Sequence, residues 1–79
     1  MKIKMLERIT WQEAIVRMCY GKYCTCTHYF GSSHESTYLY HRDSMDVIRS
    51  ISTNTMLYTE DVMDCDDILE GKWNKCELE

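Results

Sequence analysis

The sequence predicts an α+β fold: one N-terminal amphipathic helix packed on a curled antiparallel β-sheet, in a single domain spanning residues 1–79. Three observations lead to this prediction. Apolar side chains recur at helical spacing over residues 11–19. In residues 22–30 the side chains alternate between two faces, as they do in a strand. A short polar turn separates this strand from residues 36–41, which are rich in residues that favour strands. A helix laid on an antiparallel sheet buries both kinds of apolar face.

The N-terminal part of the chain contains the clearest element. Residues 2–9 alternate only roughly, so they form either a first strand or an extended lead-in. Thr10 and Glu13 then make a capping box, which satisfies two orphan N–H groups at a helix start. Gly21 stands where a residue beyond the helix end takes positive φ. The predicted apolar stripe consists of Trp11, Ala14, Ile15, Met18 and Cys19.

The middle of the chain is predicted to be a hairpin. Residues 22–30 and 36–41 are strands, and the Gly- and Ser-containing residues 31–35 turn between them. Alternation assigns one face of the first strand to Cys24, Cys26, His28 and Phe30, and the other to Tyr23, Thr25, Thr27 and Tyr29.

The C-terminal half is predicted to add three strands and a short helical turn. Residues 46–51 form a strand or, alternatively, a helical turn, and residues 55–59 form another strand. Acidic side chains suit a helix start, so residues 64–69 are expected to form a helical turn that ends at Gly71. Residues 72–78 are the closing strand, anchored by Trp73.

Size and charge limit the classes of function. A 79-residue chain buries only about 60–65% of the surface that its unfolded state exposes. We therefore expect additional stabilisation of the fold by a partner subunit, a disulfide or a metal. The net charge of −4 argues against affinity for DNA or RNA. The sequence shows neither a signal peptide nor a run of transmembrane length, so no membrane partner is expected. An odd number of cysteines, five, indicates reduced thiols in a cytoplasm.

Cysteine and histidine side chains raise the question of a metal or catalytic site. Cys24, Cys26 and His28 could bind zinc, but structural zinc sites prefer a wider cysteine spacing and four ligands. Cys65 or Cys76 would have to complete the set. We favour cysteines buried beneath the helix, and we expect no metal and no cofactor. The sequence contains no recognisable nucleophile motif, so we expect a protein that is not an enzyme.

Aromatic side chains at strand positions suggest a binding surface. Tyrosine and tryptophan stack against nucleobases and also anchor protein interfaces. For Trp11, Phe30 and Trp73 we prefer a position in the core to a role in binding. For Tyr29 and Tyr40 the two interpretations are equally favoured.

The acidic side chains concentrate in residues 60–70. Our first interpretation is that these residues form a solvent-exposed face and the start of a helix. Our second interpretation is a patch that mimics phosphates and binds a nucleic-acid-binding protein.

Several segments together resemble a known class. Residues 10–15 read Thr-Trp-Gln-Glu-Ala-Ile, and Met18, Gly21-Lys22, Asp67-Ile68-Leu69 and Trp73 follow. This pattern is similar to that of small phage proteins of the Thoeris anti-defence family. The resemblance implies an α+β fold, assembly into a homo-oligomer (dimer or tetramer), and action in the host cytoplasm. It also implies that the protein binds, without cleaving, a cyclic nucleotide immune signal. Other relatives of this class act as anti-CRISPR proteins.

This chain departs from the family pattern where the ligand pocket is expected. Residues 24–30 replace a strand that often carries basic side chains and a Trp, and Gly71-Lys72 replaces an acidic residue before Trp73. Phosphate neutralisation would then fall to Arg42, Arg49 or Lys72. The expected ligand-binding residues are Tyr29, Tyr40, Arg42, Arg49 and Trp73. The alternative is a protein-binding inhibitor of a bacterial immune nuclease that uses acidic residues 60–70.

Overall fold

The computed structural model describes residues 2–31, 33–59 and 65–79. In these residues, five strands form one antiparallel sheet in the order β1-β5-β2-β3-β4, accompanied by two helices. The elements in chain order are β1 (Ile3–Ile9), α1 (Trp11–Cys19), β2 (Cys24–His28), β3 (Ser36–Arg42), β4 (Ile48–Ser52), α2 (Cys65–Glu70) and β5 (Lys72–Leu78). The α+β class with an antiparallel sheet is confirmed. The expectation of an N-terminal helix is wrong, because β1 precedes α1.

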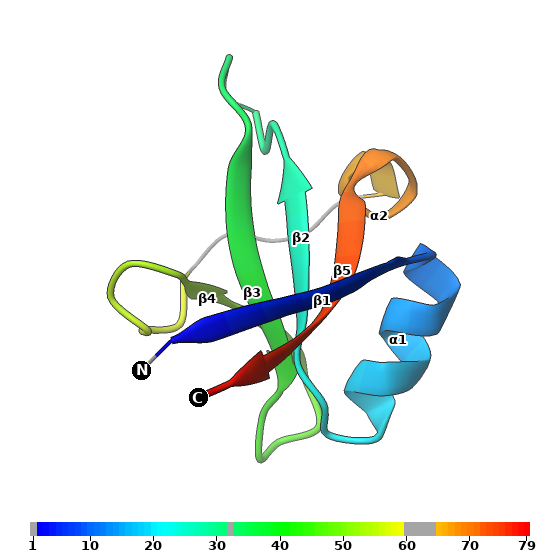
Figure 1. The fold of residues 1–79 in the computed structure, drawn as a ribbon, viewed down its shortest axis with the longest axis vertical. Helices are drawn as coiled ribbons and strands as arrows, with labels where there is room; N and C mark the ends of the chain where they lie inside the picture. Colours follow the sequence, from blue (N-terminus) through cyan, green and yellow to red (C-terminus); the bar gives the residue numbers. More distant parts are fainter. Residues whose placement is uncertain (1, 32, 60–64) are drawn as a thin grey trace.

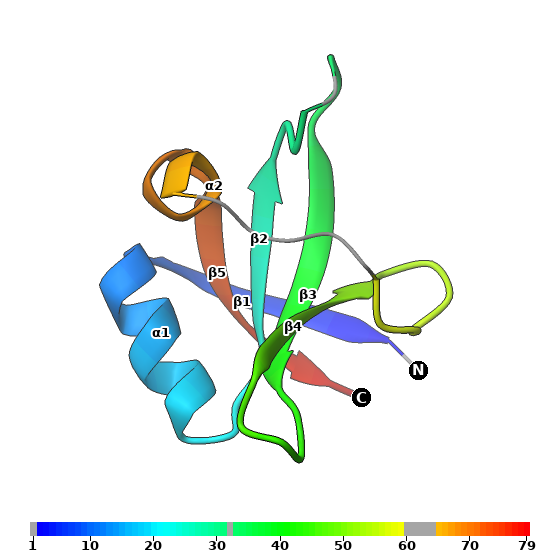
Figure 2. The same cartoon turned by 180° about the vertical axis from the view of Figure 1, so that it is seen from behind.

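The sheet is strongly twisted. Figure 1 shows β2 and β3 running upright while β1 crosses in front of them, and Figure 2 shows β4 crossing on the opposite side. Both helices lie on one side of the sheet, and the two ends of the chain lie together on the other. Backbone hydrogen bonds between Lys2 and Glu79 join these ends, with N···O distances of 3.3 and 2.8 Å.

The last strand in the sequence occupies an interior position of the sheet. β5 pairs with β1 on one side and with β2 on the other, so that Trp73 lies opposite both Ile9 and Cys26. Strands β2 and β3 pair as the predicted hairpin, with Cys24 opposite Tyr40. Because β5 joins the N-terminal strand to the hairpin, the sheet is incomplete without the last seven strand residues.

Helix α1 forms as the capping box predicts. Thr10 is the N-cap, and its side-chain oxygen accepts the Glu13 N–H at 3.2 Å. Ala14 and Met18 are fully buried against the sheet. Cys19 was expected in the same stripe but is exposed, because the buried contact of the helix ends at Met18. The chain then turns through Gly21 at φ 79°, as predicted.

The two faces of the sheet bury separate apolar clusters. The cluster under α1 is built around Trp73, Tyr40 and Met18, and Trp11 packs against it half-buried. The other face buries Leu39, Ile51 and Cys76. Burial of Cys24 and Cys26 in the cluster under α1 confirms the predicted role of these thiols as core side chains.

Two predicted strands differ from the observed ones. β4 begins at Ile48 rather than at residue 46, because Asp46 takes φ 62° in a turn closed by its N–H on the Asp43 carbonyl. Residues 55–59 form only an isolated bridge between Tyr58 and Ile51. Met56 has φ 57°, a conformation incompatible with an extended strand.

The end of α2 fits closely against β2. The Asp67 carbonyl accepts the Gly71 N–H at 3.0 Å and the Cys26 thiol at 3.8 Å. A Cβ atom added to Gly71 would collide with this carbonyl oxygen and with the Cys26 sulfur. One of the two obstacles is backbone, which cannot move aside as a flexible side chain would. Gly71 therefore permits α2 to approach the sheet.

We predict that Gly71→Ala lowers the free energy of unfolding by about 1–3 kcal/mol through overpacking. Urea denaturation followed by circular dichroism measures this change. Glu70→Ala is the control, because Glu70 is exposed and such surface changes stay within about 0.5 kcal/mol. Equal stability of the Gly71 and Glu70 variants would contradict the close approach of α2.

Candidate functional site

Two of the five sequence-predicted ligand-binding residues are core residues in this chain. Tyr40 is 3% exposed and Trp73 is 1% exposed, and their ring centroids lie 5.3 Å apart. The Trp73 indole N–H donates to the Ile68 carbonyl at 3.1 Å. These rings stabilise the interior and present almost no surface to a ligand, because residues of β1, β2 and α1 pack around them and α2 accepts the Trp73 N–H.

The two predicted phosphate-binding arginines already have acidic partners. Arg42 pairs with Asp46 at 3.7 Å, and Arg49 pairs with Asp43. The Val47 N–H, and then the Arg49 guanidinium, hold the pKa of Asp43 below its usual value, although desolvation opposes them. Both arginines are thus held at the turn between β3 and β4 by carboxylates of the same turn.

Tyr29 lies at the opposite end of the β2–β3 hairpin from these arginines. It is 48% exposed and contacts the edge of the His28 ring, at a centroid distance of 6.0 Å. The structure therefore brings together Tyr40 and Trp73 in the core, and Arg42 and Arg49 at one turn. It does not bring all five residues to one site.

The cysteine and histidine side chains of β2 are occupied by protein partners. Cys24 donates to the Ala14 carbonyl at 3.7 Å, and His28 Nε2 lies 3.3 Å from the Asp67 carboxylate. In the part of the chain that the structure describes, no three His, Cys, Asp or Glu side chains are grouped as metal ligands. Asp67, one of the acidic residues expected on a solvated face, is buried. Glu60, Asp61 and Asp64 lie outside the described residues.

The buried thiols are poor nucleophiles. Desolvation, and then the nearby Asp67 carboxylate, raise the pKa of Cys26 to about 12. Burial similarly raises the pKa of Cys76 to about 12. The pKa of Cys24 is also raised by burial, against the opposing effect of the Arg17 guanidinium. Because the thiolate is the reactive form, these three side chains remain inert thiols at neutral pH.

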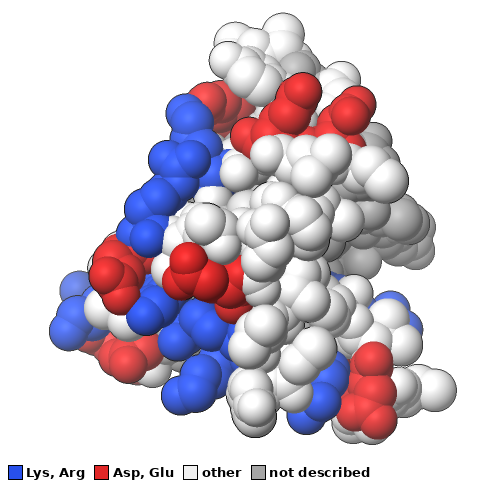
Figure 3. Space-filling view, turned by 90° about the vertical axis from the view of Figure 1, so that its right-hand side faces the viewer, with Lys and Arg blue, Asp and Glu red and all other residues white. Residues whose placement is uncertain are grey.

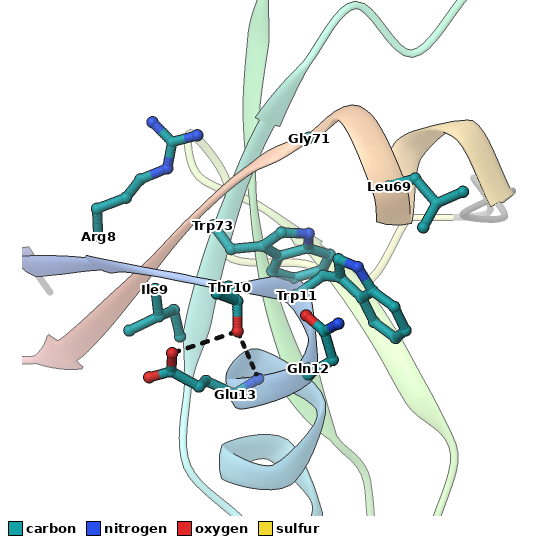
Figure 4. A pocket seen from close by; sticks show the side chains of 9 residues that line it. All are labelled: Arg8, Ile9, Thr10, Trp11, Gln12, Glu13, Leu69, Gly71 and Trp73. Carbon is teal, nitrogen blue, oxygen red and sulfur yellow. Dashed lines mark hydrogen bonds between the residues drawn. The ribbon is translucent and has the colours of Figure 1, made fainter.

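A surface pocket of about 460 Å³ lies where the beginning of α1 meets the end of α2. Figure 4 shows the Trp11 and Trp73 indoles, Leu69 from α2, and Arg8 from the end of β1 around it. Leu69 is 62% exposed, so the pocket has an apolar wall on the α2 side. The dashed lines in Figure 4 mark the capping box, which engages Thr10 and Glu13 with each other.

The beginning of α1 supplies this pocket with groups that can attract an anion, beside the Glu13 carboxylate that the capping box engages. The N–H groups of Trp11 and Gln12, the first two of the helix, have no intrahelical acceptor. A helix N-terminus carries partial positive charge that favours an anion there. Arg8 is exposed, has no ion pair among the described residues and is one of the lining residues. Figure 4 shows its guanidinium extending away from the two indoles, so a change of side-chain rotamer would be needed to bring it over them. The lining therefore contains an indole and the start of a helix, with an unpaired arginine beside them.

Sequence reasoning did not select Arg8 or Trp11 for this site. Trp11 was assigned to the core by its helical spacing, and it is half-buried because it occupies the first position of the helix. A large aromatic residue directly after an N-cap is the signal that could have indicated an exposed ring edge beside the helix N-terminus. Of the five predicted residues, Trp73 alone lines the pocket.

Comparisons of this chain with protein-family models, curated proteins and solved structures found no match. Among the residues that the structure describes, no helix has the length and apolar character needed to cross a membrane.

We predict that iodoacetamide at pH 7.5 labels Cys19 and Cys65, which are exposed, and leaves the three buried cysteines unmodified. The reason is the lack of access together with the raised thiol pKa values. Mass spectrometry after brief labelling measures the number of modified residues. Labelling in urea is the control and should reach all five, whereas labelling of Cys26 in the folded protein would contradict the assigned burial.

Proposed function

We propose that this protein is a phage anti-defence protein that binds a cyclic nucleotide immune signal and holds it without cleaving it. The observation that carries the proposal is the pocket at the beginning of α1, whose lining includes the Trp11 indole, the first turn of the helix and Arg8. Phosphate binding to helix N-termini and stacking on aromatic rings are the two contacts that a nucleotide needs.

The resemblance to the Thoeris anti-defence family supports the same function. Its first motif, residues 10–15, contains the N-cap and the first turn of α1, which form one side of the pocket. Its C-terminal motif, residues 67–69, contributes Leu69 on the other side, and the Trp73 that follows it lies beneath both. The Gly21-Lys22 pair of the same pattern lies at the other end of α1, outside this pocket. The proposed pocket therefore gathers three of the segments on which the resemblance rests.

The proposed mechanism is sequestration rather than catalysis. The pocket places no buried carboxylate pair and no free thiol beside the expected phosphate position, and Glu13 is engaged by Thr10. The cavity is open on one side, so we further propose that a second copy of the chain covers it in a homo-oligomer (dimer or tetramer). A covered pocket excludes water and strengthens the charged contacts.

The competing proposal, inhibition of an immune nuclease through acidic residues 60–70, has less support in the described residues. Asp67 is buried and pairs with His28, so it is unavailable to a partner. Asp66 and Glu70 are exposed and remain compatible with such a role.

We predict that a cyclic nucleotide signal at about 100-fold excess over its dissociation constant raises the melting temperature by several degrees. Binding to the folded state alone contributes about 2.7 kcal/mol at that excess. Differential scanning fluorimetry with a panel of cyclic nucleotides measures the shift. After heat denaturation, chromatography should recover the nucleotide intact, because the proposed protein does not cleave it.

Variants at the pocket and away from it make this test specific. Arg8→Gln should weaken binding about tenfold by removing a charge-assisted hydrogen bond, and Trp11→Ala should weaken it further by removing the stacking surface. Tyr29→Ala is the matched control, because this exposed aromatic ring lies outside the pocket lining. Absence of a shift with every nucleotide, or equal weakening by the control, would reject the pocket as the binding site.

A further inference from the structure

The Arg17 side chain crosses from α1 to the beginning of β2, on the opposite end of the helix from the Trp11 pocket. It lines two separate cavities, of about 380 and 410 Å³. One guanidinium nitrogen, Nη2, donates to the Tyr23 carbonyl at 3.5 Å. The side chain is half-buried between the helix and the sheet, so its charge is partly removed from water.

Arg17 lacks a counter-charge in the part of the chain that the structure describes. It takes part in none of the ion pairs there, and its Nε–H is buried without a hydrogen-bond acceptor, although the neutral Cys24 thiol lies close to the guanidinium. A partly buried cation with an unsatisfied donor is unfavourable unless an anion meets it. Arg42 and Arg49, by contrast, have carboxylate partners. Buried cations usually have a carboxylate partner, but in this chain the half-buried Arg17 has none.

The residue best placed to neutralise Arg17 is used elsewhere. Glu13 precedes Arg17 by four positions, which is the favourable order for a helical ion pair. Its carboxylate instead accepts the Thr10 hydroxyl at 3.2 Å in the capping box. Lys75, which lines the smaller cavity with Arg17, is itself cationic and is paired with Glu7 at 2.8 Å.

The larger cavity has a net positive lining. Arg17 and Lys22 contribute two cations, and Lys22 has no ion pair among the described residues. Glu77 contributes one carboxylate, but Lys4 is directly opposite it in the β1–β5 register and offsets its charge. Tyr23, Leu78 and Cys76 supply the apolar part of the lining.

The surrounding surface carries charges of both signs. Figure 3, which views the side of the molecule that bears the helices, shows Lys and Arg atoms running down one edge of that face, with acidic atoms at its upper end, among the cationic atoms and at its lower end. The excess of positive charge is therefore a property of the cavity lining, in a chain whose net charge is −4.

We propose that the cavity between the end of α1, the beginning of β2 and the end of β5 binds a small organic oxyanion, a phosphate monoester or a carboxylate, anchored by Arg17. The guanidinium meets the oxyanion through its fork of N–H donors. Lys22 adds a second charge at the rim, and the apolar lining holds the organic part of the ligand. This site is separate from the Trp11 pocket and does not depend on the proposed nucleotide function.

The test uses the Nε–Hε resonance of Arg17 in the ¹⁵N-labelled full chain. Phenyl phosphate, benzoate and inorganic phosphate are titrated separately, with sodium chloride at equal ionic strength as the reference. We expect a saturable shift of the Arg17 resonance with phenyl phosphate or benzoate, and a smaller one with inorganic phosphate, which lacks the organic part. Which of the two ring compounds binds better distinguishes a phosphate site from a carboxylate site.

Two variants establish whether Arg17 is the anchor. Arg17→Lys keeps the charge but removes the fork of donors, and it should weaken phenyl phosphate or benzoate binding about tenfold in calorimetry. Lys22→Ala changes an exposed side chain and should weaken the binding severalfold without affecting folding. Arg49→Lys is the matched control, because Arg49 is paired with Asp43, and it should bind as the wild type does.

The proposal is overturned if the Arg17 resonance moves no further with the three anions than with chloride. Equal affinities of the Arg17→Lys, Lys22→Ala and wild-type proteins would also overturn it. Retained binding after Trp11→Ala is expected, since the Trp11 pocket lies at the other end of α1.

Discussion

The interior contacts of Trp73 hold the separate parts of this small domain together. Its backbone lies between Ile9 of β1 and Cys26 of β2 in the sheet. Its ring packs against Tyr40 of β3, and its indole N–H donates to the Ile68 carbonyl of α2. Truncation of a buried Trp typically costs about 3–5 kcal/mol, which is a large part of the stability of a domain of this size. Through its backbone and its ring, this one residue of β5 therefore connects three other strands and a helix.

This arrangement also determines where surface pockets can form. Because α2 is fixed to Trp73 through Ile68 and to Cys26 through Asp67, its exposed Leu69 faces the first turn of α1. The close approach requires glycine at position 71. The pocket at the beginning of α1 is thus a consequence of core packing rather than of a dedicated loop, because its lining comes from the end of β1, the start of α1, the end of α2 and β5.

The distribution of paired and unpaired charges separates structural from candidate binding groups. Arg42, Arg49, Lys72 and Lys75 each have a carboxylate partner. Lys2, Lys4, Arg8, Arg17 and Lys22 have none among the described residues, and the last three of these five line cavities beside α1. Arg42 and Arg49 were expected to meet phosphate because residues 24–30 replace the basic strand of the resembled family, but nearby Asp46 and Asp43 neutralise them locally.

The sequence by itself determined the helices and strands that depend on interactions between residues close together in the chain. The capping box set the beginning of α1, alternation set the β2–β3 hairpin and the faces of its residues, and residues 72–78 read correctly as a strand. Only the tertiary structure decided that β5 inserts between β1 and β2, because strand partners far apart in sequence are chosen by which apolar faces fit together, and no local pattern records that choice. The same packing buried Tyr40 and Trp73 and left the Arg8 and Arg17 groups at cavities. The sequence determined which side chains could bind a ligand, whereas long-range packing decided which of them remain free to do so.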